Sequence, residues 1–262
     1  EREAERQLVS EQSLLERTQQ ELDAQAELLR GEAAALRAGN QLAPPPTAAR
    51  DAAQRVGRAG APFWQLLEFH AHVEANERAG LEAALEASGL LDAWVTPEGA
   101  VLHPETADAF LQIGAPRSSS LCHWLAAADA VPVERTVIEA LLASIHGAAL
   151  DDVDADSWIS PRGQFRLGRL HGRFQKPEAQ YVGWAAREAA RQRRLLQVEH
   201  EIEQLEVRAS ELRGRQSDLS ARQERLALEL RTTPRDQDVR DAHARLSDRE
   251  SERRHAQERL AE

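Results

Sequence analysis

The residues whose types could carry chemistry lie in the middle of the chain. His70 and His72 stand two residues apart, and this spacing puts both imidazoles on one face of a strand. Zinc normally takes three or four protein ligands, and the sequence offers no further ligand beside this pair. We therefore expect no metal site here.

Cys122 and His123 follow the cluster Ser118–Ser120, and together these residues superficially supply a nucleophile and a base. Adjacent residues on a helix do not face each other, and no carboxylate stands where it would orient the imidazole. We interpret Cys122 as a small buried apolar side chain. The sequence therefore predicts no catalytic residue, no cofactor-binding residue and no metal ligand, and the fragment is not expected to be an enzyme.

A third stretch is basic. Residues 162–176 include no acid, although the chain has a formal net charge of -11. Such a patch can neutralise phosphates, and Phe165 or Phe174 can stack on bases. The alternative is a solvated strand edge whose charges keep sheets from aggregating. The candidate DNA contacts are Arg162, Arg166, Arg169, Arg173 and Lys176.

Aromatic residues mark out one globular domain. They make up only 4% of the 262 residues, and all of them lie between Phe63 and Trp184. Outside these limits Glu, Arg, Gln, Ala and Leu dominate, which is the composition of long helices and coiled coils. We predict an incoming arm at 1–57, a globular domain at 58–182 and an outgoing arm at 183–262.

The wider composition bounds the setting of the protein. The chain begins with Glu1 and has no Met, so we expect a fragment of a longer protein. A single Cys suits a reducing cytoplasm. No apolar run approaches the roughly 20 residues that cross a bilayer, so no membrane association is expected. The acidic net charge argues against the whole chain being a generic polyanion binder.

The outgoing arm has an apolar seam whose members alternate three and four residues apart. A seam this narrow favours a partner helix over a globular core. Pro234 lacks a backbone N–H, so we expect a break near 232–234, after which a shifted seam resumes at Val239. The seam residues are Leu195, Val198, Ile202, Leu205, Ala209, Leu212, Gln216, Leu219, Gln223, Leu226 and Leu230.

The incoming arm has a leucine at every seventh position, and Gly39–Asn40 ends its helix. Both arms join the same domain, so antiparallel pairing within one chain is the economical way to bury both seams. The alternative is that each arm pairs with its own copy in a second chain. The basic run at 187–194 is expected to pair with glutamates of the incoming helix. The leucines are Leu8, Leu15, Leu22, Leu29 and Leu36.

The domain repeats one short device. Residues 93–99 (AWVTPEG) and 157–163 (SWISPRG) each place a Trp before a Pro-x-Gly turn, which is typical of hairpins. We predict an α+β domain of two pseudo-equivalent lobes with Trp–turn–strand hairpins. The alternative is that two unrelated hairpins share turn chemistry. We also expect strands at 63–69, 100–102 and 108–114 and helices at 121–128 and 133–145. The outgoing helix is expected to have Pro177 near its start. The expected core or interface anchors are Trp64, Trp94, Trp124 and Trp158.

Two strings carry a family resemblance. ERAGLEAALEASGLLDAWVTPEG and WISPRGQFRLGRLHGRFQKPEAQYVG resemble the hinge region of the SMC-like, MukB-related ATPases of bacterial Wadjet (JetABCD, also called Ept) plasmid-defence operons, the JetC-type subunit. The resemblance covers about residues 58–185. Over the arms it consists of generic coiled coil.

The resemblance implies a hinge that joins two chains at the end of their coiled-coil arms. The parent would be a DNA-loop-extruding ATPase that binds ATP and Mg in head domains outside this fragment, and the phosphate-loop motif is absent here. Its implied partners are kleisin-like and winged-helix subunits and a Toprim-type nuclease. Hinges of the wider family meet through Gly-containing strands, which makes Gly168, Leu170 and Gly172 the candidate dimer contacts. The alternative is bulges in an ordinary hairpin.

Three other interpretations remain open. The first is a DNA-repair coiled-coil protein, although the C-x-x-C motif of a zinc hook is missing. The second is an enzyme that its helical arms oligomerise, which would need a cluster of titratable residues in a cleft. The third is a scaffold whose coiled coil carries an inserted adaptor domain.

Overall fold

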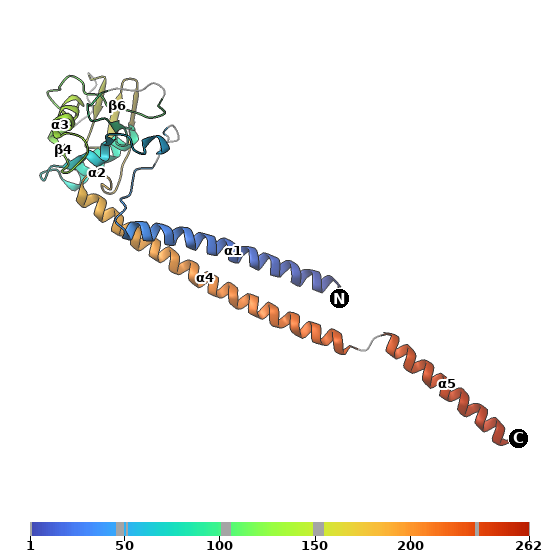
Figure 1. The fold of residues 1–262 in the computed structure, drawn as a ribbon. Coiled ribbons are helices and arrows are strands. Elements are labelled where there is room, and N and C mark those ends of the chain that lie inside the picture. The colour runs from blue at the N-terminus through green and yellow to red at the C-terminus, as the bar shows by residue number, and fades with distance from the viewer. Residues whose placement is uncertain are drawn as a thin grey trace. The chain divides into compact units, whose positions relative to one another are not determined.

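The computed structural model describes residues 2–45, 50, 52–100, 106–148, 155–233 and 236–261. The chain divides into two compact units, Glu1–Leu29 with Glu201–Glu262, and Arg30–His200. Long helices and small antiparallel sheets make it a mixed α+β protein, as predicted (Figure 1). Pro234 and most of the strand expected at 100–102 lie outside the described residues.

Two helices of the first unit run side by side in opposite directions. They belong to α1 (Arg2–Arg37) and α4 (Trp184–Thr232). The Gln223 side-chain N–H donates to the Gln12 side-chain oxygen at 3.2 Å, and Leu8 shares a groove with Leu226. On α4 in this unit, every buried or half-buried residue except Glu201 belongs to the seam read from the sequence. These residues are Ile202, Leu205, Ala209, Leu212, Gln216, Leu219, Gln223, Leu226 and Leu230.

The third helix of this unit, α5 (Asp236–Ala261), has no apolar face covered by any described residue. The side chains of Val239, Leu246 and Leu260 are 58%, 57% and 88% exposed. Because α4 ends at Thr232 and α5 begins four residues later, the helix is interrupted where the sequence predicted a break.

In the second unit, the end of α1 lies against the start of α4. Arg194 pairs with Glu32 at 2.7 Å, so the basic run reaches a glutamate of the incoming helix as predicted. The Arg191 guanidinium also donates to the Leu36 carbonyl oxygen. Gly39, at a φ of 92°, ends α1 where the sequence indicated.

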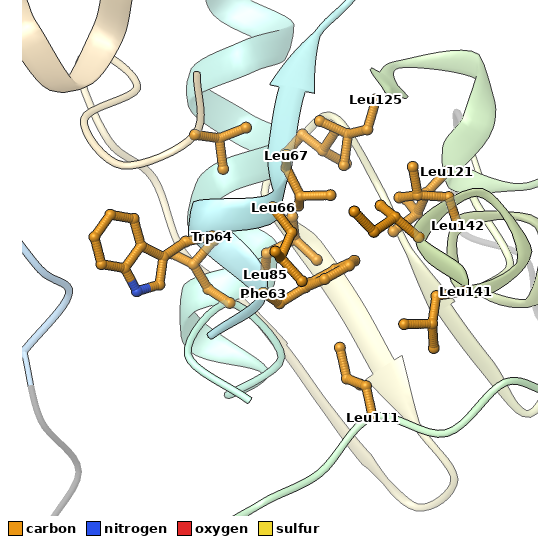
Figure 2. Close-up of a cluster of buried hydrophobic side chains, with 14 of the residues drawn as sticks. Phe63, Trp64, Leu66, Leu67, Leu85, Leu111, Leu121, Leu125, Leu141 and Leu142 are labelled. Carbon is orange, nitrogen blue, oxygen red and sulfur yellow. The ribbon is translucent and has the colours of Figure 1, made fainter. Parts of the chain in front are cut away.

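The core of the second unit lies between α2 (Ala75–Ala87) and α3 (Arg135–Ser144). Figure 2 shows Phe63 and Leu66 meeting Leu141 and Leu142 of α3. Burying apolar side chains such as these supplies the main driving force for folding. Four of the five tryptophans are buried as expected of core anchors, and they are Trp64, Trp94, Trp124 and Trp158.

Three small antiparallel sheets frame this core. The first pairs β1 with β3, the second pairs β2 with β4, and the third has the order β5-β6-β7. The strands are β1 (Ala61–Pro62), β2 (Leu67–Phe69), β3 (Trp94–Val95), β4 (Leu125–Ala127), β5 (Ser157–Ile159), β6 (Gln164–Leu167) and β7 (Leu170–Arg173).

Several elements differ from the sequence prediction. The segment 121–128 was expected to be a helix, but it forms one 3₁₀ turn (Leu121–His123) followed by β4. Pairing with β2 outweighs the helix propensity of alanine. The expected strand at 63–69 begins as a 3₁₀ turn, and the one at 108–114 is reduced to a single bridge between Phe110 and Trp94.

The two Trp devices share a turn but not a strand pairing. In the second device, β5 and β6 form the predicted hairpin across Pro161–Gly163, with Gly163 at a φ of 81°. In the first, the Gly99 N–H closes the turn on the Thr96 carbonyl at 3.0 Å. However, β3 pairs with β1, and no hairpin forms within the described residues. Within the described residues, the two devices therefore share their turn chemistry but not a hairpin.

Candidate functional site

The three-stranded sheet presents one apolar face and one basic face. Ile159 and Phe165 lie opposite each other in the β5–β6 register, and both belong to the core. Side chains alternate along each strand, so the next register position faces the other way. There Trp158, Arg166 and His171 form one row across all three strands. The sheet therefore directs an imidazole and a guanidinium away from the core.

The basic face is hollowed into a groove of about 630 Å³. Arg166 is partly engaged, because its Nε donates to the Gly168 carbonyl at 3.1 Å. Arg169 and Arg173 make no ion pair with any described residue. Among the described residues no carboxylate lines the groove, whose charged side chains are arginines. Its lining residues are Trp158, Gln164, Phe165, Arg166, Gly168, Arg169, His171, Gly172 and Arg173.

The structure thus brings three of the five candidate DNA contacts together, and it adds His171 and Trp158. The strand register needed to find those two residues was not available from spacing alone. Arg162 lies apart from the groove, in a cleft of about 580 Å³ against the first turns of α2, where Arg173 also reaches.

Lys176 was wrongly predicted to contact DNA. Its side chain is only 7% exposed, and its Nζ lies 2.6 Å from the Glu82 carboxylate and 2.8 Å from that of Glu86. Burial alone would lower the pKa of Lys176, but the two carboxylates raise that pKa above its usual value. The charge is therefore neutralised inside the domain and is not offered to a partner.

The candidate dimer contacts lie around β7, which is an edge strand. Leu170, at its start, is 61% exposed. Gly168 sits at a φ of 60° in the two-residue turn before β7. A Cβ at Gly172 would lie 2.9 Å from the Phe165 ring. Both glycines therefore have a reason within the hairpin, and the exposed Leu170 is the residue that intrachain packing does not explain.

A second cluster lies where α4 joins the domain. The Glu82 carboxylate of α2 is fully buried and accepts the backbone N–H groups of Gln180, Tyr181 and Val182 at 2.7, 2.8 and 2.8 Å. Together with Lys176 these donors satisfy a charge that would otherwise be costly to bury. No sequence signal distinguished Glu82 from the half-buried glutamates of the same helix, Glu77 and Glu86.

The helix begins at Trp184 because of the residues just before it, and the expected start near Pro177 was wrong. Gly183 has a φ of 89°, and a Cβ there would collide with the Glu68 carboxylate. That carboxylate accepts the Trp184 N–H at 2.9 Å. Arg187, one turn later, is buried and donates to the Tyr181 carbonyl oxygen at 3.2 Å. Burial lowers the pKa of Arg187.

The incoming segment is held by a compact ionic cluster. Arg55 bonds to Asp108 at 2.6 Å and to Asp92 at 2.9 Å, and Arg58 bonds to Asp108 at 2.8 Å. Arg50 also pairs with Asp92 at 2.9 Å. Burial would raise the pKa of Asp108, but hydrogen bonds from Arg55 and from a backbone N–H lower that pKa below its usual value.

The histidine candidates form a cluster of aromatic rings. The rings of His70 and His72 stack at 5.5 Å between centroids, and that of His123 meets His72 edge-on at 5.4 Å. Within the described ranges, no group of three or more His, Cys, Asp or Glu side chains is placed to hold a metal ion. Cys122 is exposed, so its interpretation as a buried apolar residue was wrong.

No protein-family model matches the chain, and no curated protein matches it. Among the described residues, none of the helices has a stretch both long and apolar enough to span a membrane.

Proposed function

We propose that the chain is a dimerisation module, the hinge with its adjoining coiled-coil arms of an SMC-like ATPase. The observation that carries this proposal concerns two helices of one chain. One leads into the second unit, the other leads out of it, and the two lie against each other within that unit. Arg37 of α1 pairs with Glu199 of α4 at 2.7 Å, beside the contact between Arg194 and Glu32. A domain held at the end of two paired helices is suited to joining two long rods.

The free edge of the sheet supports self-association. An edge strand presents unpaired backbone groups that readily pair with another strand. The β7 strand has no partner on its outer side among the described residues, and Leu170 projects from it into solvent. Two copies that met antiparallel along β7 would satisfy these groups and bury both Leu170 side chains. The arginines of the hairpin would limit this pairing to a specific geometry.

Light scattering tests this proposal on the full chain. We expect a mass of twice 29.1 kDa. Leu170→Glu should reduce it to the monomer, because the new charge would be buried at the seam. Leu196→Glu is the matched control, since Leu196 is 68% exposed on α4. A monomeric wild-type chain would refute the proposal. A dimer that Leu170→Glu leaves intact would move the seam away from β7 and favour the scaffold interpretation, in which the helices associate.

The wider assignment follows from the family resemblance alone. We place the parent protein among the Wadjet-type, MukB-related ATPases, with ATP and Mg bound by head domains outside this chain. Kleisin-like and winged-helix subunits and a Toprim-type nuclease would then be its partners, and it would act in the cytoplasm on the nucleoid or on plasmids. Co-purification of the parent protein with these subunits would test this assignment. A parent protein that is monomeric with and without ATP would contradict it.

We also propose DNA contact at the basic groove, because three arginines line it and Arg169 and Arg173 make no ion pair with any described residue. Replacing Arg166, Arg169 and Arg173 together with Glu should weaken duplex binding at low salt by at least about tenfold. Arg193→Glu is a control, since Arg193 already pairs with Glu178 at 2.6 Å. Unchanged affinity in the triple variant would remove the groove from consideration.

A further inference from the structure

We infer that Glu82 is a clamp that fixes the first turns of α4 to the β7 edge strand, so that this strand and the helix move as one body. The feature that needs explaining is the segment 174–183, which connects them. It has no helix or strand, and such connections are ordinarily the mobile parts of a domain. Here, however, its backbone is held at both ends.

The near end of the segment is fixed to the hairpin. The Phe174 N–H donates to the Gly163 carbonyl at 2.8 Å, directly after β7 ends. Two residues later, Lys176 inserts its ammonium between Glu82 and Glu86 of α2, and the same ammonium lies 4.2 Å from the centre of the Tyr181 ring. A shift of β7 would therefore pull on a buried ion pair.

The far end of the segment is fixed to the same carboxylate. Glu82 accepts three successive N–H groups, those of residues 180–182, and these three groups can reach it together only while the chain keeps its present turn. One carboxylate thus binds both the lysine that follows β7 and the backbone that precedes α4. Losing it would leave a buried ammonium and three buried N–H groups without their main acceptor, which is a costly state.

The first turn of α4 is held by two further contacts. The Glu68 carboxylate of β2 accepts the Trp184 N–H, and the Arg187 guanidinium donates to the carbonyl oxygens of Tyr181 and Trp64 at 3.2 and 3.3 Å. These contacts come from elements other than α2. The start of the helix is consequently held by contacts on two sides, which restrain rotation of the helix about Gly183.

The clamp deepens the proposed function, because a rigid junction would make the direction of the arm depend on how β7 meets a second copy. Its own test does not need dimerisation. Spin labels at Thr136→Cys on α3 and Gln197→Cys on α4, in a Cys122→Ser background, report the distance between domain and helix. The labelled chain is diluted with unlabelled chain, so that only distances within one chain are measured. A second pair, Thr136→Cys with Arg169→Cys, reports on the domain alone.

We expect a narrow distance distribution for the domain–helix pair in the wild type. Glu82→Gln should broaden it by roughly twofold or more at temperatures well below unfolding, while the pair within the domain stays unchanged. Glu86→Gln is the matched control: Glu86 bonds to Lys176 but to none of the three N–H groups, so the narrow distribution should persist. A merely stabilising role for Glu82 would lower the melting temperature without this broadening in the native state.

A wild-type width in folded Glu82→Gln would overturn the inference. Should Glu82→Gln fail to fold, Lys176→Met decides the question with labels at Arg169→Cys beside β7 and Gln197→Cys on α4, because Glu82 then keeps its three backbone donors while the link to β7 is cut. Broadening in Lys176→Met supports the clamp, and a wild-type width there refutes it. If the chain proves monomeric but Glu82→Gln broadens the distribution, the dimer proposal fails and the clamp stands.

Discussion

The ionic cluster around Asp108 is the clearest place to test how this domain holds its incoming segment. The Asp108 carboxylate is 1% exposed and accepts from Arg55 and Arg58 at 2.6 and 2.8 Å. The Oδ1 atom that accepts from Arg55 also accepts the Ala109 N–H at 2.8 Å. Asp108→Asn keeps the shape, removes the charge and places an amide N–H against guanidinium donors.

The magnitude follows from what remains after the substitution. Breaking a buried ion pair from one side costs about 3–5 kcal/mol, and hydrogen bonds to charged groups contribute about 1.5–3 kcal/mol each. The arginines are 16% and 19% exposed and keep Asp92 nearby, so we expect the lower end, about 3 kcal/mol. For a unit of this size that corresponds to a melting temperature lower by roughly 6–12 °C.

Urea unfolding followed by tryptophan fluorescence measures this free energy. Asp129→Asn is the matched control, because Asp129 is 93% exposed in its pair with Arg135 and exposed pairs contribute little. The pKa of Asp108 is lowered in the folded state, so its stabilisation is present above the unfolded aspartate pKa, about 3.9, and disappears as pH falls through the folded value. The difference between wild type and Asp108→Asn should therefore shrink in acid. A neutral-pH difference no larger than that of Asp129→Asn would refute the reasoning.

Two pairs of matched substitutions test packing. A Cβ at Gly80, in α2, would collide with the backbone carbonyl of Pro161, whereas a Cβ at Gly214, in α4, would meet nothing within 4 Å. We therefore expect Gly80→Ala to lower the melting temperature. Gly214→Ala should stabilise α4 by about 0.5–1 kcal/mol. Leu205 is 4% exposed and Leu228 63%, so Leu205→Ala should cost about 2 kcal/mol by circular dichroism melting and Leu228→Ala less than about 0.5 kcal/mol. Equal effects within either pair would contradict the described packing.

Periodicity predicted the helices well, because their burial depends on one repeating contact. The seam of α4 could be read from spacing alone, and so could the end of α1 at Gly39–Asn40. The second hairpin was also predictable, since a Pro-x-Gly turn constrains the backbone locally. These features share a cause: each is decided by residues near in sequence.

The errors concern residues whose environment depends on distant partners. β4 looked helical because its strand partner, β2, lies more than fifty residues away in the sequence. Lys176 looked like a free cation because Glu82 lies 94 positions before it. Cys122 was assigned to the core, yet it lies in the 3₁₀ turn before β4 and is exposed. Burial and ion pairing across such separations cannot be read from spacing.

The distribution of arginine partners connects the fold with the proposals. The chain has 44 acidic and 33 basic residues, so carboxylates are abundant enough to pair with every cation. In the second unit this happens at both helix connections, where Arg55 and Arg194 find Asp or Glu. On the sheet no such pair forms among the described residues, where Arg169 and Arg173 line a groove without a described carboxylate. An unpaired arginine that is exposed to water costs little folding stability. In a chain this acidic, however, we would expect a carboxylate beside each of these arginines if folding were their only role. These arginines are therefore the residues on which the proposed DNA contact depends, and a bound anion would neutralise them.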